Sequence, residues 1–214
     1  MSLVILRVVV IAVALGIWFW TQKLIANKSG DMNAIGDGVH RLTARWHRYF
    51  STHEKAADRA LVISSLCIDL LGLSLIAAAV FGKSFAPFIG IILVFSLRQI
   101  SQLCCTLPPP PGIIWRDPGF PTILVTYSVG NDFFFSGHTA LAVLGAIEIC
   151  HMAPWWLGAI AVCIALGEAM IVLVLRAHYT LDVITGAFAA WFAADMAGKL
   201  APWMDAWLHQ VLLK

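Results

Sequence analysis

A histidine and an aspartate are spaced in a way that could support nucleophilic or acid–base chemistry. In the stretch LRAHYTLD, His178 and Asp182 are four residues apart and therefore share one face of a helix. The carboxylate of Asp182 can accept the Nδ1 proton of the imidazole and leave the other ring nitrogen free. An imidazole held in this way is prepared to act as a nucleophile or a base. By itself, the pair could also be a polar contact between two helices.

A second histidine, His138, follows Ser136 and Gly137 at the start of a long apolar segment. Ser136 can cap the helix that begins here, and Gly137 lets the backbone come close to a ligand. Free N–H groups and the positive end of the helix make this position suited to a phosphate oxygen. We therefore expect His138 to meet His178 across a phosphate group. A histidine that only caps a helix is the alternative.

The chain is too apolar for a water-soluble protein. Of its 214 residues, 60% are hydrophobic and only 12% are charged, with a mean hydropathy of +0.85. We predict an all-α integral membrane protein with a single membrane domain over residues 1–214. The net charge of +2 does not suggest nucleic acid as a partner. No metal or other cofactor is expected, because the acidic residues, histidines and five cysteines form no recognisable ligand set.

Apolar runs of about twenty residues predict a bundle of six transmembrane helices. The predicted spans are 4–20, 61–81, 85–103, 139–151, 156–175 and 181–196. The fourth is short and would need to extend back through Phe133 to Phe135 to cross a bilayer. The first ends in bulky aromatic residues without a small-residue cleavage step, so we interpret it as a retained anchor rather than a signal peptide.

Two polar stretches interrupt these runs. In the connection 26–59, apolar residues recur at helical spacing while the arginines point elsewhere, which predicts an amphipathic helix in the headgroup plane between spans one and two. These apolar residues are Ile35, Val39, Leu42, Trp46, Tyr49 and Phe50. An ordinary surface connector is the alternative. The second stretch, 108–132, opens with LPPPPG and is predicted to be a stiff, shaped loop that leads into Ser136.

A six-span arrangement brings the polar elements to one membrane face. His138, His178, the proline loop and Arg98 would all lie there, and Arg98 and Arg176 could hold an anion. Three further acidic residues fall inside predicted spans and could either contact the site or pair within the bundle. They are Asp69, Glu148 and Glu168.

These motifs resemble those of a known superfamily. Ser136-Gly137-His138, followed by His178-x-x-x-Asp182, resembles the second and third motifs of the type 2 phosphatidic acid phosphatases, which are six-helix lipid phosphatases and transferases. The stretches 132–139 and 178–182, with Arg98 ahead of them, are similar to the sphingomyelin synthase branch. Arg176 and the stretch 129–131 resemble plant phosphatidylcholine:diacylglycerol cholinephosphotransferase more closely still. The resemblance covers residues 98–199, which would form the catalytic core.

The resemblance implies both an activity and its residues. A phosphocholine or phosphoethanolamine head group would move from a phospholipid donor to diacylglycerol or ceramide through a phosphohistidine, in a multi-pass protein of a bacterial inner membrane or a eukaryotic endomembrane. The implied catalytic residues are His138, His178 and Asp182. The implied substrate-binding residues are Arg98, Arg176, Ser136, Gly137, Asp132 and Tyr179.

The chain departs from the superfamily pattern at two positions. Phe135 stands where classical members have proline, and Val172 stands where they have a phosphate-binding arginine. Fewer cations favour a phosphodiester donor with one negative charge over a phosphomonoester with two. A lipid phosphate or polyprenyl pyrophosphate phosphatase is the first alternative, and a non-catalytic lipid-binding protein is the second. Basic residues in the connection 26–59 favour a cytoplasmic site, whereas the resemblance favours the opposite face. Head group, acceptor and oligomeric state stay open.

Overall fold

The computed structural model describes residues 3–26, 35–125, 127 and 133–212. Within these ranges the chain forms eight helices and no strand, which confirms the predicted all-α class. The helices are α1 (Leu3–Ala26), α2 (Gly38–Leu42), α3 (Ala44–Thr52), α4 (Glu54–Phe81), α5 (Ala86–Cys104), α6 (Gly137–Met152), α7 (Trp155–Val174) and α8 (Thr180–Leu212).

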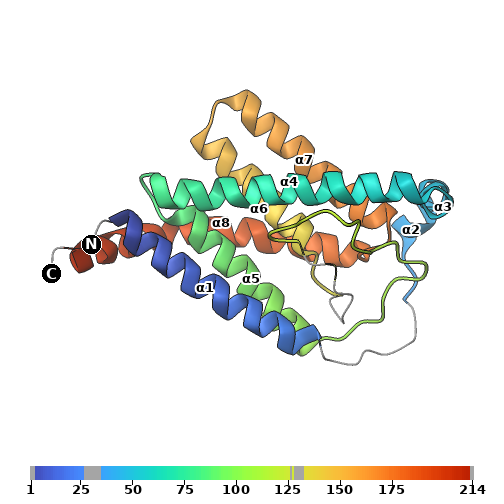
Figure 1. Cartoon of the computed structure of the whole chain (residues 1–214), viewed down its shortest axis with the longest axis horizontal. Helices are drawn as coiled ribbons and strands as arrows, with labels where there is room; N and C mark the ends of the chain where they lie inside the picture. Colours follow the sequence, from blue (N-terminus) through green and yellow to red (C-terminus); the bar gives the residue numbers. More distant parts are fainter. Residues whose placement is uncertain (1–2, 27–34, 126, 128–132, 213–214) are drawn as a thin grey trace.

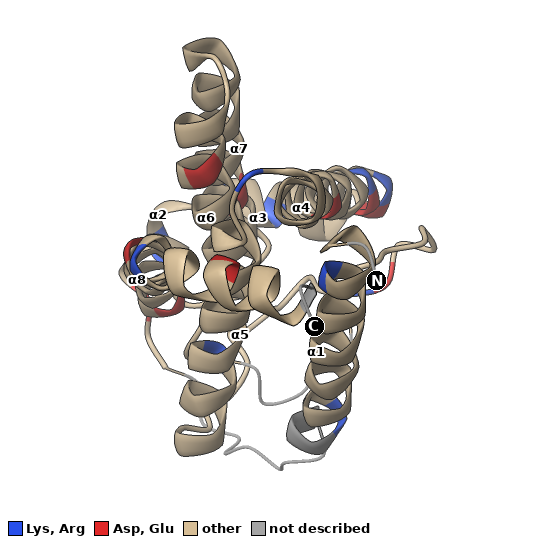
Figure 2. Ribbon diagram, turned by 90° about the vertical axis from the view of Figure 1, so that its left-hand side faces the viewer, with Lys and Arg blue, Asp and Glu red and all other residues tan. Residues whose placement is uncertain are grey.

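The two longest helices, α4 and α8, run along the long axis of the molecule (Figure 1). Helices α1 and α5 lie obliquely on one side of them, and the α6–α7 hairpin projects on the other (Figure 2). The main contacts join α6 to α7 and join α8 to both α5 and α6. Buried side chains of α4, α5 and α6, including Leu75, Val94 and Leu144, form the centre of the core. Helix α6 is therefore held between α7 and α8, and its first turn faces the first turn of α8.

Among the described residues, four helices are long and apolar enough to cross a membrane: α1, α4, α5 and α7. Helix α6 is apolar but has only 16 residues. The predicted extension of its span through Phe133 to Phe135 is wrong, because the Ser136 side chain accepts the N–H of Thr139 and starts the helix at Gly137. Helix α8 is not among the four, since charged residues interrupt its apolar surface. The prediction of six spans is thus not confirmed for 139–151 and 181–196.

Helix α8 also continues past the predicted end of the last span to Leu212. Two of its charged residues have partners that make this continuation favourable. Lys199 bonds to Asp195 one turn earlier at 2.6 Å, and Asp205 lies 3.4 Å from the buried guanidinium of Arg7 in α1. Arg7 also donates to the carbonyl of Gly82 at 2.9 Å, so it ties the ends of α1, α4 and α8 together.

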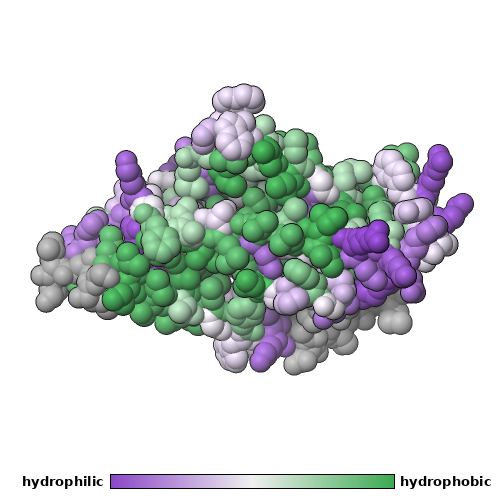
Figure 3. Space-filling model, turned by 45° about the horizontal axis from the view of Figure 1, so that its top comes forward, coloured by the Kyte–Doolittle hydropathy of each residue, from purple (hydrophilic) through white to green (hydrophobic). Residues whose placement is uncertain are grey.

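The surface supports a membrane location. Figure 3 shows hydrophobic residues across the middle of the molecule and hydrophilic residues at the end that carries α2 and α3. Lys, Arg, Asp and Glu are sparse on most of the ribbon (Figure 2). Apolar side chains such as Val13, Leu166 and Phe188 are more than half exposed on the helices. A continuous apolar surface of this extent is expected of a protein that contacts lipid.

The predicted interfacial helix is present as two short helices, α2 and α3, with a break at Thr43. The hydroxyl of Thr43 donates to the carbonyl of Val39 at 2.8 Å. The face that packs on the protein is polar and carries His40, Thr43 and His47. The apolar Leu42, Trp46 and Tyr49 and the arginines beside them are exposed. Of the apolar residues identified from the sequence, Ile35, Leu42, Trp46 and Tyr49 therefore face outward, whereas Val39 and Phe50 pack against the core.

Candidate functional site

The His178–Asp182 pair predicted from the sequence forms at the start of α8. Nδ1 of His178 lies 3.2 Å from Oδ2 of Asp182. Because an ionised carboxylate only accepts hydrogen bonds, Nδ1 is the nitrogen that donates in this contact, and Nε2 is the nitrogen that points away from Asp182. The same Oδ2 accepts the backbone N–H of Tyr179 at 2.9 Å, which fixes the carboxylate. The Asp182 side chain is fully buried, whereas the His178 side chain is 10% exposed and can still be reached.

The first turns of α6 and α8 are joined directly, which brings the two histidine motifs together. The backbone N–H of Ser136 donates to the carbonyl of Asp182 at 3.0 Å. Gly186, one turn further along α8, packs against the backbone of the same segment, and a Cβ there would lie only 2.6 Å from the carbonyl oxygen of Ser136. Only glycine permits so close an approach.

His138 lies in this junction on the second residue of α6. Its ring meets the face of Trp115 edge-on, with 4.9 Å between the ring centroids. His138 also interacts electrostatically with His178 and Arg98. Its Nε2 is buried and has no hydrogen-bond partner among the described residues. The nitrogen that would move a proton is therefore not occupied by another group of the described chain.

Arg98 reaches the same junction from α5, although it is distant from both motifs in the sequence. Its side chain is buried and packs on Gly137, where a Cβ would lie 3.1 Å from Nε of the arginine. Gly137 therefore leaves room for the guanidinium beside the free N–H groups at the start of α6. This combination of a cation and a helix N-terminus suits the oxygens of a phosphate group.

The predicted proline loop covers the site and is fastened to α4. Its Trp115 packs on His138 and also on Tyr127, with 5.0 Å between the two aromatic ring centroids. The carboxylate of Asp69 accepts the backbone N–H groups of Ile123 and Leu124 at 2.9 and 2.8 Å. Asp69 thus holds the loop in place. Because both of its oxygens bond to this backbone, its contribution to the site is indirect.

The two other buried acidic residues lie away from the histidine pair. Glu168 of α7 accepts a hydrogen bond from the hydroxyl of Ser64 in α4 at 2.6 Å. Glu148 is buried on α6, ten residues beyond His138 and therefore about 15 Å along the helix. Glu168 thus joins α7 to α4.

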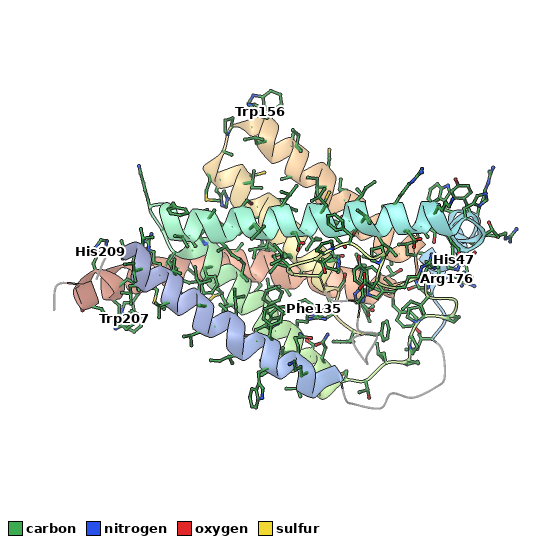
Figure 4. All side chains as sticks on the ribbon, in the orientation of Figure 1. His47, Phe135, Trp156, Arg176, Trp207 and His209 are labelled. Carbon is green, nitrogen blue, oxygen red and sulfur yellow. The ribbon has the colours of Figure 1, made fainter. Side chains whose placement is uncertain are left out.

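Two of the predicted substrate-binding residues, Arg176 and Tyr179, form side-chain hydrogen bonds to other segments of the described chain rather than to the two histidines. Arg176 adopts a positive φ of 54° and donates from Nη1 to the carbonyl of Pro111 at 2.7 Å, so it holds the start of the proline loop. It lies beside His47, as the labelled side chains in Figure 4 show. The hydroxyl of Tyr179 accepts the N–H of Ile35 at 3.3 Å. Asp132 lies outside the described residues.

The connection before α2 contributes Asp37, a carboxylate that the sequence pattern did not single out. Oδ1 of Asp37 accepts the N–H groups of Val39 and His40 and so caps α2. The same carboxylate accepts the N–H of Thr180 at 2.6 Å and its hydroxyl at 2.8 Å, and so also caps α8. Burial raises the pKa of Asp37, but the hydrogen bonds from Thr180 and His40 outweigh this effect and leave the pKa lowered.

Two histidines of the same connection hold the backbone around His178. Nε2 of His40 donates to the carbonyl of His178 at 2.9 Å, and Nδ1 of His47 donates to the carbonyl of Val174 at 3.0 Å. The ring of His40 also stacks on Tyr179. A signal was present, because His40, Thr43 and His47 recur at the three-and-four spacing of one helical face. The same stretch also carries an apolar stripe at helical spacing, and most of that stripe faces outward.

We predict that Asp37→Ala loosens the segment that carries His178. Loss of both helix caps should destabilise the protein by about 1–2 kcal/mol, and misplacement of the imidazole should lower any activity of the site by up to roughly 10²-fold. Thermal unfolding and a rate assay on the purified variant measure both effects. Asp195→Ala, which removes an exposed carboxylate distant from the site, is the control: it should leave activity unchanged and lower stability by only about 0.5 kcal/mol or less, through loss of its surface bond to Lys199. An active Asp37→Ala protein of normal stability would contradict this role.

The family model AtPDCT1/2 matches residues 38–199, which include α2 to α7 and most of α8. No curated protein and no solved structure matches the chain. The matched residues contain both histidine motifs, Arg98 and the proline loop. The match confirms the cholinephosphotransferase resemblance, and the chain belongs to the AtPDCT1/2 family of phosphatidylcholine:diacylglycerol cholinephosphotransferases.

Proposed function

We propose that this protein transfers the phosphocholine head group of phosphatidylcholine to diacylglycerol, with His178 as the nucleophile. Family membership supports the choice of the two lipids. The observation that carries the proposal is the hydrogen bond between Nδ1 of His178 and Asp182, which turns Nε2 of the imidazole away from the carboxylate and toward the substrate side. A neutral imidazole with a buried carboxylate behind it is an activated nucleophile.

In the first half-reaction, Nε2 of His178 attacks the phosphorus of phosphatidylcholine and forms a P–N bond. The P–O bond to the diacylglycerol oxygen breaks, and a protonated His138 donates its proton to that oxygen. Diacylglycerol leaves, while phosphocholine stays on His178. Asp182 keeps its hydrogen bond to Nδ1 and stabilises the positive charge that develops on the ring.

In the second half-reaction, the now neutral His138 accepts the proton of the hydroxyl group on another diacylglycerol. The hydroxyl oxygen attacks phosphorus, the P–N bond breaks, and a new phosphatidylcholine leaves. His138 is protonated again, so the cycle closes without water. The contact of Trp115 with His138 supports this route, because a ring over the proton carrier limits the access of water, whose attack would release phosphocholine.

Arg98 would hold the non-bridging oxygens of the phosphate while negative charge grows on them. Its burial and its position against Gly137 support this role. Arg176 would contribute less to phosphate binding, since its guanidinium bonds to the proline loop. One cation at the phosphate suits a phosphodiester, which carries a single negative charge.

A transfer assay in vesicles tests this function. The vesicles contain the purified protein, phosphatidylcholine with labelled choline, and a diacylglycerol whose acyl chains differ from those of the donor. We expect label in a new phosphatidylcholine that carries the acyl chains of the added diacylglycerol, and no transfer when diacylglycerol is omitted. Release of phosphate from phosphatidic acid or from a polyprenyl pyrophosphate, without transfer, would contradict the proposal and indicate a phosphatase.

A further inference from the structure

An apolar groove runs along the α6–α7 hairpin where it faces α8. Its volume is about 480 Å³, which is within the range of about 300–1,000 Å³ typical of small-molecule sites. The lining is almost entirely aliphatic, with Val143, Ala146, Leu166 and Ala187 among its residues. Leu166 is well exposed, so one side of the groove is open. In a membrane this open side faces lipid.

One end of the groove lies at the first turns of α6 and α8, the turns that carry His138 and Asp182. Its lining includes Thr139, the residue after His138, and Val183, the residue after Asp182. At the other end it reaches Cys150 and His151, in the last turn of α6. A molecule in the groove would therefore have one end beside the two histidines and the other near the tip of the hairpin.

The length of the groove fits one hydrocarbon chain. From Thr139 to His151 the α6 backbone rises about 18 Å. One leaflet of a bilayer has a hydrocarbon thickness of about 15 Å, half of the whole core. The polar Thr139 lies at the end near the first turns of α6 and α8, aliphatic residues line the middle, and His151 lies at the far end.

We propose that this groove binds one acyl chain of the diacylglycerol moiety and so directs its oxygen at His178 and His138. The inference rests on the proposed function. The same groove serves both half-reactions, because the diacylglycerol that leaves and the one that arrives carry the same chemical group. A chain that moves from bilayer hydrocarbon into an aliphatic groove gains little transfer free energy. The groove therefore acts by orienting the diacylglycerol oxygen, and we expect it to change the rate of head-group transfer more than the affinity for the lipid.

Three phenylalanine substitutions on α7 test the groove through acyl-chain length. Val162 lines the far part of the groove, Ala169 lines the part near the site, and Ala159 is exposed outside it. Val162→Phe should lower transfer to dioleoylglycerol by roughly tenfold and leave transfer to dioctanoylglycerol unchanged. Ala169→Phe should lower both. Ala159→Phe should change neither, and it controls for added bulk on the same helix.

A photoactivatable diacylglycerol, with its reactive group in the middle of an acyl chain, tests binding without turnover. We expect adducts on groove residues such as Ile147 and Leu166, both in the wild-type protein and in an inactive His178→Ala protein. If the wild-type protein transfers no head group, the proposed function fails, and the adducts still decide whether the groove binds the chain. Adducts spread evenly over lipid-facing helices, or an unchanged chain-length preference in Val162→Phe, would overturn the inference.

Discussion

We expect His178→Ala to abolish head-group transfer. The substitution removes the nitrogen that would bond to phosphorus, and Asp182 behind it is fully buried and so cannot take its place. We expect the rate to fall by a factor on the order of 10⁴ or more, to the background of the assay. The measurement is the formation of labelled phosphatidylcholine from labelled donor and unlabelled diacylglycerol in vesicles.

The matched control for this substitution is His209→Ala. His209 is exposed near the end of α8 that is remote from the site (Figure 4), so its loss should leave transfer unchanged. Both variants should be extracted and purified like the wild-type protein, since the His178 side chain makes one hydrogen bond to the described part of the chain, with Asp182. A His178→Ala protein with normal transfer would exclude this residue as the nucleophile.

His138→Ala has the second largest expected effect. Without an acid to protonate the departing diacylglycerol oxygen, transfer should fall by about 10² to 10⁴-fold, the usual contribution of general acid–base catalysis. The buried Nε2 without a hydrogen-bond partner among the described residues supports the assignment of this role. The same vesicle assay measures the loss.

A donor with a better leaving group separates the roles of the two histidines. p-Nitrophenyl phosphocholine releases nitrophenolate without needing a proton. His138→Ala should therefore keep a first turnover with this donor, which is visible as a burst of nitrophenolate, whereas His178→Ala should show none. Equal loss of the burst in both variants would contradict the division into acid and nucleophile.

The part of the site that depends on local spacing could be predicted from the sequence. The spacing of four residues between His178 and Asp182 places them on one helical face in any helix, and Ser136 has the residue type of an N-cap. Both features appear as hydrogen bonds in the structure. The helical spacing of apolar residues in the connection likewise predicted helix there, and α2 and α3 form within it.

Contacts between distant segments could not be predicted. Thr180 and Asp37 are 143 residues apart, and His40 and the carbonyl of His178 are 138 residues apart. No periodicity within either segment encodes such a pairing, because it depends on how α2 docks on α7 and α8. The match of the AtPDCT1/2 family to residues 38–199 begins within this docked connection, next to Asp37.

Helix lengths were predicted less well than helix positions. Hydropathy ends the last span near Met196, because Lys199 and Asp205 lower the apolar average beyond it. The pairing of Asp205 with Arg7 of α1 removes the reason for the helix to end there. For α6 the predicted span was too long rather than too short. The apolar run continues back through Phe135, but the cap at Ser136 makes Gly137 the first helical residue.

The stereochemistry of transfer at phosphorus tests most directly whether the head group passes through His178. A phosphatidylcholine made chiral at phosphorus by sulfur substitution is used as the donor, and the configuration of the new phosphatidylcholine is determined. Two successive in-line displacements, the first by His178 and the second by diacylglycerol, invert phosphorus twice and predict net retention. Net inversion would mean that the acceptor attacks the donor directly, which would contradict the phosphohistidine.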